Sequence, residues 1–208
     1  MPALAGRGPL DSSAGGFGAL NSYVPAASAA QSLLPGVTLV LGGARSGKSR
    51  YAESLIGGTL AAGGTAVYVA TATAGDAEMA ARIAAHRARR GPQWLTVEEL
   101  YDLAGVLRRE SAPERPVLVD CLTLWLSNLM AAQRDIAAAT SDLLAALATL
   151  PGPVVLVSNE VGLGIVPDNA LARAFRDHAG RLHQEIAATA RRVVFVVAGL
   201  PLVLKESE

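Results

Sequence analysis

The sequence predicts an α/β protein with a mainly parallel β-sheet and helices on both of its faces. Short apolar runs alternate with longer amphipathic stretches along most of the 208 residues, as in strands joined by right-handed helical crossovers. The hydrophobic fraction is 51% and the aromatic fraction only 4%, so small and aliphatic side chains must build the core. Buried parallel strands covered by Ala-rich helices have this composition.

The first 36 residues are predicted to be a flexible low-complexity tail, which leaves one folded domain over residues 37–208. This tail is rich in Gly, Ala, Ser and Pro and shows no sustained periodicity. Such a segment buries too little apolar surface to fold by itself. No basic stretch followed by an apolar run is present in it, so no secretory signal is predicted.

A phosphate-binding loop (P-loop) is predicted where the first apolar strand ends. The segment Gly42-Gly43-Ala44-Arg45-Ser46-Gly47-Lys48-Ser49 fits the pattern G-x-x-x-x-G-K-[ST] between a strand and a helix. Its glycines let backbone N–H groups approach phosphate oxygens, toward which the next helix directs its positive end. Lys48 would bridge the β- and γ-phosphates, and the Ser49 hydroxyl would ligate Mg²⁺. We therefore expect a P-loop nucleotide-binding protein.

The other elements follow from apolar periodicity, capping residues and glycine or proline stops. The helix after the P-loop is expected to reach about Ala62, where Gly63-Gly64 would end it. Further strands are predicted at 65–70, 93–97, 116–120, 153–157, 193–197 and 202–204. Further helices are predicted at 76–90, 98–110, 122–130, 135–150 and 168–190. Loops at the carboxyl ends of the parallel strands should form the site.

Two carboxylates follow predicted strands and are candidates for the site. Asp120 ends a strand where P-loop proteins place the carboxylate that holds Mg²⁺, although a cap on the next helix is the alternative. Glu160 follows Ser158-Asn159 and would serve as a general base or a substrate ligand. A loop carboxylate paired with an arginine is the alternative for Glu160.

The predicted helix 76–90 carries a histidine among arginines. Arg82, His86, Arg89 and Arg90 lie at helical spacing on one face. Neighbouring cations disfavour the protonated imidazole, which would leave His86 neutral and nucleophilic near pH 7. The same arginines are suited to hold a polyphosphate. From these residues alone, a solvated basic helix face remains the alternative.

The last long helix, 168–190, is expected to begin behind Asp168 as its N-cap and to carry one apolar stripe. His178 falls on that stripe and is expected to be a hydrogen-bonded core residue, whereas His183 falls off it and should be solvated. The stripe consists of Leu171, Phe175, His178, Leu182 and Ile186.

Charge and cysteine content exclude several classes of protein. Lys plus Arg and Asp plus Glu each number 18, so no overall field attracts nucleic acid or acidic lipid. The single cysteine, Cys121, excludes an internal disulfide, and no Cys/His spacing suggests zinc. The longest apolar run near the C-terminus, 193–204, is too short to span a bilayer and is broken by Gly199 and Pro201. We expect a cytoplasmic protein with no nucleic-acid partner and no membrane span.

Taken together, these segments resemble the bifunctional adenosylcobinamide kinase/adenosylcobinamide-phosphate guanylyltransferase family of cobalamin biosynthesis. The resemblance covers essentially all of residues 37–205, and the combination of the P-loop, the His86 segment and NEVGLGIVP is highly specific. The matching stretches are GGARSGKSRYAE (42–53), YVAT (68–71), EMAARIAAH (78–86), WLTVE (94–98), VDCLTLWLSNL (119–129) and SNEVGLGIVPDNALARAFRDHAGRLHQ (158–184).

The resemblance implies two reactions on a RecA-like P-loop fold. A nucleoside triphosphate, ATP or GTP, phosphorylates the aminopropanol hydroxyl of adenosylcobinamide. GTP then transfers GMP to the phosphate of adenosylcobinamide phosphate through a covalent histidine intermediate, at the position of His86. The family is also a cytoplasmic homo-oligomer, typically a trimer.

The resemblance also implies which residues form the site. His86 would be the nucleophile, beside the catalytic Lys48 of the P-loop. The metal ligands Ser49 and Asp120 and the candidate base or substrate ligand Glu160 come from the residue patterns described above. Histidine at position 183 departs from the family pattern, where asparagine is more usual. The implied nucleotide contacts are Gly42 to Ser49, Ala70, Thr71, Ala72, Arg87, Ala88, Arg89, Arg90, Glu98 and Asp120.

Three other functions compete with this interpretation. A RecA-like ATPase acting on nucleic acid would share the P-loop, but balanced charge and few aromatics disfavour it. A nucleotide-sensing module would need neither a nucleophile nor a second substrate. A kinase-only homologue would phosphorylate cobinamide and form no guanylyl-enzyme.

Overall fold

The computed structural model describes residue 34 and residues 36–72 and 90–207. Most of the predicted tail and most of the predicted helix 76–90, including His86, Arg87, Ala88 and Arg89, lie outside the described residues. The division between tail and domain at residue 37 therefore stays a prediction.

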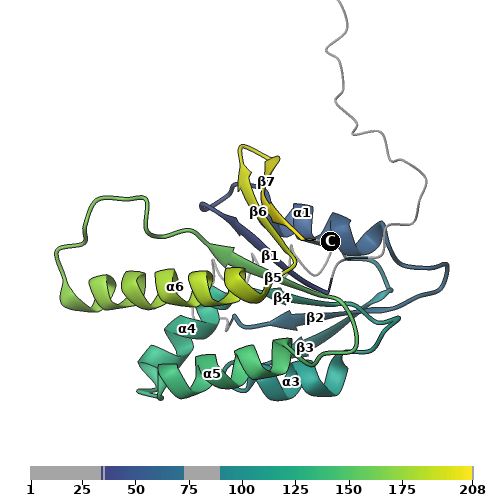
Figure 1. The fold of residues 1–208 in the computed structure, drawn as a ribbon, viewed down its shortest axis with the longest axis horizontal. Helices are drawn as coiled ribbons and strands as arrows, with labels where there is room; N and C mark the ends of the chain where they lie inside the picture. Colours follow the sequence, from purple (N-terminus) through teal and green to yellow (C-terminus); the bar gives the residue numbers. More distant parts are fainter. Residues whose placement is uncertain (1–33, 35, 73–89, 208) are drawn as a thin grey trace, which may run out of the picture. The chain divides into compact units, whose positions relative to one another are not determined.

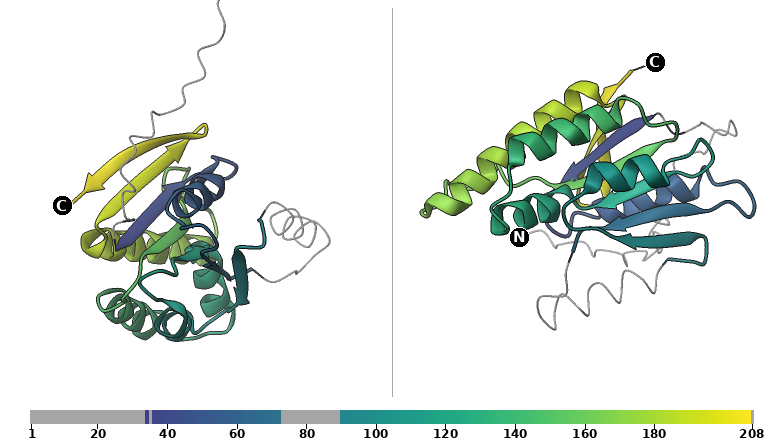
Figure 2. Two further views of the ribbon diagram at one scale, coloured as in Figure 1. Left: turned by 90° about the vertical axis from the view of Figure 1, so that its right-hand side faces the viewer. Right: turned by 90° about the horizontal axis from the view of Figure 1, so that it is seen from below.

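The described residues form one seven-stranded sheet in the order β3-β2-β4-β5-β1-β6-β7. Every neighbouring pair is parallel except β6 and β7, which are antiparallel. Figure 2 shows this last pair side by side at one edge of the sheet, with β3 at the other edge. The strands are β1 (Val37–Gly42), β2 (Ala66–Ala70), β3 (Trp94–Glu98), β4 (Val117–Asp120), β5 (Val154–Asn159), β6 (Arg192–Val197) and β7 (Leu200–Glu206).

Helices cover both faces of the sheet (Figure 1). On one face Ala52 and Ile56 of α1 pack against a core that includes Val40. On the other face, side chains such as Trp125 and Ile186 pack against a core that includes Leu39. The helices are α1 (Lys48–Gly57), α3 (Leu103–Glu110), α4 (Leu122–Ala131), α5 (Ile136–Leu147) and α6 (Ala170–Thr189). The prediction of a mainly parallel P-loop α/β sheet with helices on both faces is confirmed.

Two helix ends differ from the prediction for local reasons. The first helix ends at Gly57 rather than near Ala62, because the consecutive residues Gly57-Gly58-Thr59 favour a helix end there. Thr59 donates its hydroxyl to the Ile56 carbonyl at 2.9 Å and thereby satisfies one of the last helical acceptors. The helix predicted from residue 98 begins only at Leu103, where the Asp102 side chain accepts from the Gly105 amide at 2.9 Å.

Helix α6 is rotated relative to the predicted stripe. Its buried residues are Ala179, Leu182, His183 and Ile186, whereas Leu171 is 69% exposed. The expectation of a core His178 and a solvated His183 is therefore wrong. Only the C-terminal half of α6 lies over the sheet, and its first half extends beyond it (Figure 1).

The N-cap of α6 is also one residue later than predicted. Asn169, rather than Asp168, accepts from the Ala172 amide at 2.7 Å. Both residue types cap helices well, so the sequence did not distinguish these two neighbours.

Candidate functional site

The P-loop joins β1 to α1 through backbone conformations that its sequence requires. Gly47, the N-cap of α1, has φ +95°, in the left-handed region that glycine tolerates best. The Gly47 carbonyl accepts from the Tyr51 amide at 3.0 Å, which is a helical hydrogen bond at the start of α1. The N-terminus of α1 therefore opens directly onto the loop, as phosphate binding requires.

Lys48 is buried within the P-loop rather than extended into solvent. Its side chain carries the ammonium back to the Gly43 carbonyl, which accepts from Nζ at 3.1 Å. This contact places a positive charge across the loop from the N-terminus of α1. Lys48 is thus positioned to neutralise phosphate oxygens, as the P-loop pattern predicts.

The register of the parallel strands brings the predicted polar residues to one edge of the sheet. Ala70 of β2 pairs with both Glu98 of β3 and Asp120 of β4. Gly42 pairs with Asn159, and the Glu160 amide donates to the Gly42 carbonyl at 3.1 Å. Carboxyl ends of parallel strands share an edge, so the structure places Glu98, Asp120 and Glu160 along the same edge of the sheet as the P-loop, with Glu160 nearest to it.

Asp120 is oriented by an aromatic residue that the sequence analysis did not select. The Tyr68 hydroxyl donates to Asp120 Oδ2 at 3.1 Å. Burial, and then the Asp120 charge, raise the pKa of the Tyr68 phenol far above its ordinary value, while Arg90 acts to lower it. Tyr68 therefore stays protonated and remains a donor. The sequence contains one signal for this role of Tyr68. The residue lies two positions before the end of β2, on the face of the sheet that α1 covers.

Arg90 lies on the same tyrosine. Its guanidinium carbon is 3.4 Å from the centroid of the Tyr68 ring, close enough for a cation–π contact. Trp94 packs edge-on against this ring at 6.3 Å between centroids. Arg90, the residue that follows 89 in the chain, is thus held beside Tyr68, the residue that orients Asp120.

Thr71, one of the expected nucleotide contacts, is a buried connecting residue. Its hydroxyl accepts from the Cys121 amide and donates to the Cys121 carbonyl, both at 2.8 Å. Asn128 donates to the Thr71 carbonyl, also at 2.8 Å. The side chain is fully buried, so Thr71 ties the end of β2 to the start of α4 and supports the position of Asp120.

A second polar group lies behind Glu160. Ser158 Oγ and His183 Nε2 are 2.7 Å apart, and both residues are buried. His183 Nδ1 lies 4.0 Å from Glu160 Oε2. Burial lowers the pKa of His183, and the Glu160 carboxylate opposes that shift. In the sequence, His183 belongs to a second helical stripe with Ala179, Leu182 and Ile186, which was the signal that could have identified it.

The oxygen donors at this edge fit a magnesium ion held largely by its substrate. The described residues contain no group of three or more His, Cys, Asp and Glu side chains that could hold a metal. Mg²⁺ instead commonly uses one or two protein oxygens together with substrate phosphates. The Ser49 hydroxyl at the start of α1 and the Asp120 carboxylate are donors of that kind.

Comparison with known proteins gives a consistent result. Residues 38–204 match the family described as cobinamide kinase/cobinamide phosphate guanyltransferase. The chain is 54% identical over 170 residues to the bifunctional adenosylcobalamin biosynthesis protein CobP of Pseudomonas aeruginosa, with 80% of this chain and 96% of that protein covered. It is 43% identical over 182 residues to the bifunctional adenosylcobalamin biosynthesis protein CobU of Escherichia coli, with coverages of 80% and 98%.

Among solved structures, the Pyrococcus horikoshii protein studied as Project ID PH0250 superposes with a TM-score of 0.51 and 9% identity. That alignment covers 85% of this chain and 89% of the other, and it is a likeness of fold alone. Within the described part of the chain, every helix is too short or too polar to cross a bilayer.

Proposed function

Because the chain belongs to the cobinamide kinase/cobinamide phosphate guanylyltransferase family, we propose that His86 carries the guanylyl group between its two substrates. The protein is a bifunctional enzyme of adenosylcobalamin biosynthesis. Because the chain belongs to this family, the bifunctional activity is favoured over the three alternatives named above, which were a nucleic-acid ATPase, a nucleotide sensor and a kinase-only enzyme.

The proposed transfer proceeds in two balanced steps. A neutral imidazole nitrogen of His86 attacks the α-phosphorus of GTP, the bond to the α,β-bridging oxygen breaks, and pyrophosphate leaves. A phosphate oxygen of adenosylcobinamide phosphate then attacks the same phosphorus, the phosphorus–nitrogen bond to His86 breaks, and adenosylcobinamide-GDP leaves as the neutral imidazole is restored. Covalent catalysis of this kind divides one difficult transfer into two easier ones.

The observation that carries this proposal is the shared edge of the sheet. Lys48, the first residue of α1, folds its ammonium group back to the Gly43 carbonyl of the P-loop, and Asp120 is oriented by Tyr68 at the end of β4, on the same edge of the sheet. We assign nucleotide contacts to the P-loop, to Ala70–Ala72 by position and to Glu98 and Arg90. Asp120 belongs to the same set, Arg87, Ala88 and Arg89 are assigned to nucleotide binding by resemblance, and His86 is assigned the catalytic role. Mg²⁺ held by Ser49 and Asp120 would neutralise phosphate charge.

Glu160 is our candidate for the base of the kinase reaction. Its amide is bonded to the first residue of the P-loop and its carboxylate faces the buried His183. Glu160→Gln should reduce the rate of cobinamide phosphorylation at least tenfold and leave the Kd for GTP nearly unchanged. Asp177→Asn, on the exposed side of α6, is the matched control. Equal kinase rates in wild type and Glu160→Gln would remove the assignment.

We further propose that the enzyme acts in the cytoplasm as a homo-oligomer, a trimer by resemblance to the family. Its nucleotide substrates belong to that compartment. Apolar side chains on β7 support self-association, since Leu200, Leu202 and Leu204 are each more than half exposed and large exposed apolar patches mark contact surfaces.

The direct test of the nucleophile uses GTP labelled in its α-phosphate, with Mg²⁺ and without any corrinoid. Wild-type enzyme should take up an acid-labile, alkali-stable label, as expected for a phosphoramidate, and His86→Ala should take up none. His178→Ala, which changes a half-exposed histidine of α6, should label normally. A wild-type enzyme that binds GTP without labelling, or a labelled His86→Ala variant, would contradict the proposal.

A further inference from the structure

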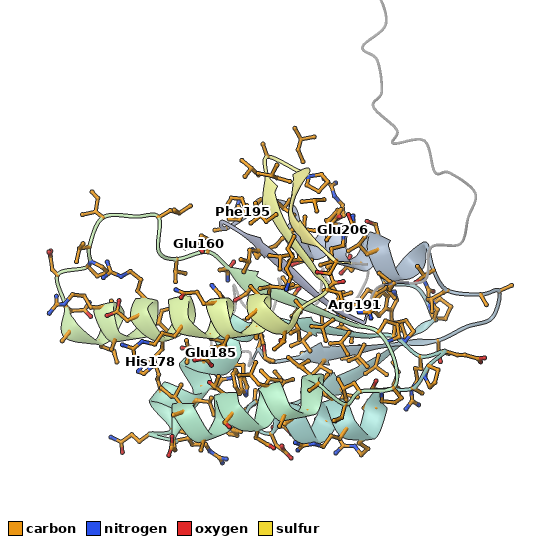
Figure 3. All side chains as sticks on the ribbon, viewed as in Figure 1. Glu160, His178, Glu185, Arg191, Phe195 and Glu206 are labelled. Carbon is orange, nitrogen blue, oxygen red and sulfur yellow. The ribbon has the colours of Figure 1, made fainter. Side chains whose placement is uncertain are left out.

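A cavity of about 410 Å³ lies between the first half of the P-loop and the end of β6. Residues 43–46 form one side and residues 195–198 the other. Glu160 and Leu163, from the segment that follows β5, complete the wall. Figure 3 shows the Glu160 and Phe195 side chains, which both contribute to this cavity.

The walls combine apolar surface with one carboxylate and one cation. Leu163 is 82% exposed and Val197 is 53% exposed, so two aliphatic side chains face solvent from different elements. Glu160 and Arg45 are the charged residues of the lining. Such a cavity suits an amphiphilic ligand that presents a hydroxyl group beside an apolar body.

The cavity adjoins the phosphate-binding part of the P-loop without coinciding with it. Gly43 belongs to the cavity wall and also accepts from Lys48 Nζ at 3.1 Å. Gly47, Lys48 and Ser49, which begin α1, are not part of the wall. A terminal phosphoryl group held by Lys48 would therefore face the cavity across Gly43.

Glu160 is held in place at this boundary. Its Oε1 accepts from the Gly162 amide at 2.5 Å, and its Oε2 faces His183 Nδ1 at 4.0 Å. The first contact also closes the turn that presents Leu163, the next residue along the chain. The carboxylate and the aliphatic wall are thus parts of one local structure.

We propose that this cavity binds the hydroxyl-bearing arm of the corrinoid during the kinase reaction. The hydroxyl oxygen attacks the γ-phosphorus, the bond from that phosphorus to the β,γ-bridging oxygen breaks, and the nucleoside diphosphate leaves. The hydroxyl proton passes to the Glu160 carboxylate. Leu163 and Val197 pack against the apolar part of the arm. This assignment rests on the proposal that Glu160 is the kinase base.

The test compares two substitutions on one loop, Leu163→Ser and Ile165→Ser. Both side chains are largely exposed, at 82% and 98%, so neither change should affect folding, but only Leu163 lines the cavity. Leu163→Ser should raise the KM for cobinamide about tenfold and leave the KM for the nucleotide unchanged. Ile165→Ser should change neither constant.

A second pair tests the opposite wall by adding bulk. Val197→Trp should reduce cobinamide phosphorylation more than tenfold, whereas Leu95→Trp, at an equally exposed site on β3, should not. Guanylyl labelling from GTP alone needs no corrinoid, so it should be normal in all four variants. Loss of that labelling in Leu163→Ser and Val197→Trp would contradict the assignment to the acceptor.

Two further results would overturn the proposal. One is an unchanged cobinamide KM in both Leu163→Ser and Val197→Trp. The other is a change of oligomeric mass in these variants that accounts for any lost activity, because the cavity would then belong to a contact between copies. If Glu160→Gln retains full kinase activity while both cavity variants still raise the KM, the base assignment fails and the binding site stands.

Discussion

Tyr68 shows how one side chain orients the carboxylate that we propose as a Mg²⁺ ligand. It donates to Asp120 at 3.1 Å, while its ring lies beneath Arg90. Residues that orient a metal ligand commonly affect metal affinity ten- to a hundredfold. Tyr68 therefore acts through Asp120, and it is a positioning residue.

Tyr68→Phe should weaken Mg²⁺-dependent GTP binding about tenfold, because the ring and its contacts remain while the hydrogen bond to Asp120 is lost. The measurement is a Mg²⁺ titration of GTP binding by calorimetry. Tyr101→Phe is the matched control, since that ring also lies beneath an arginine, Arg134, at 4.2 Å. Identical titrations for wild type and Tyr68→Phe would show that Asp120 is oriented by other groups.

His183 makes stability depend on pH. Burial lowers its pKa in the folded protein below the ordinary value of 6.5. The unfolded chain therefore binds a proton at a pH where the folded protein does not, and the free energy of unfolding should fall as pH drops below 6.5. The loss should stop once the pH is below the lowered pKa of the folded state.

Urea denaturation from about pH 7.5 to about pH 5 measures this contribution. His183→Asn should flatten the slope below pH 6.5, because the amide does not titrate. His178→Asn, on the less buried part of α6, should retain the wild-type slope. A His183→Asn variant that loses stability on acidification as steeply as wild type would assign the effect to other groups.

At the scale of elements, the first turn of α6 tests which of two adjacent capping residues is used. Asn169→Ala should lose about 1 kcal/mol of local stability, because the Ala172 amide loses its acceptor. Asp168→Ala should have little effect, since Asp168 contributes its backbone carbonyl to Arg173 at 2.6 Å. Amide exchange in residues 170–173 should accelerate about fivefold in Asn169→Ala alone. Equal acceleration in both variants would contradict the observed cap.

The two edge strands offer a test at the scale of the whole molecule. Leu202 of β7 is 58% exposed and Leu95 of β3 is 53% exposed, so each presents an apolar side chain at an edge of the sheet. Leu202→Lys should shift the proposed oligomer toward monomer, because burying an unpaired ammonium group in an interface is costly. Leu95→Lys should leave the mass measured by light scattering unchanged. A monomeric wild type, or an oligomeric Leu202→Lys variant, would exclude a β7 interface.

Most strands could be placed from the sequence within one or two residues. Each combines an apolar run with a clear stop, as in Val117–Asp120, which was expected at 116–120. Helix ends were less predictable, because Gly57 and Gly63 are equally good stop signals and only the fold shows which one is used. β7 is longer than the predicted 202–204, since its pairing with β6 extends the strand in both directions, from Leu200 to Glu206.

The sequence by itself determined the P-loop, the alternation of strands and helices, and the family to which the chain belongs. These features depend on residues close together along the chain, so local patterns are sufficient to reveal them. Only the tertiary structure decided that Tyr68 orients Asp120, that His183 is buried beside Glu160, and that Leu163 and Val197 face one cavity. The first and third relationships depend on how the strands and their loops are arranged in the sheet, and the second also depends on the rotation of α6, so all three join residues distant in sequence.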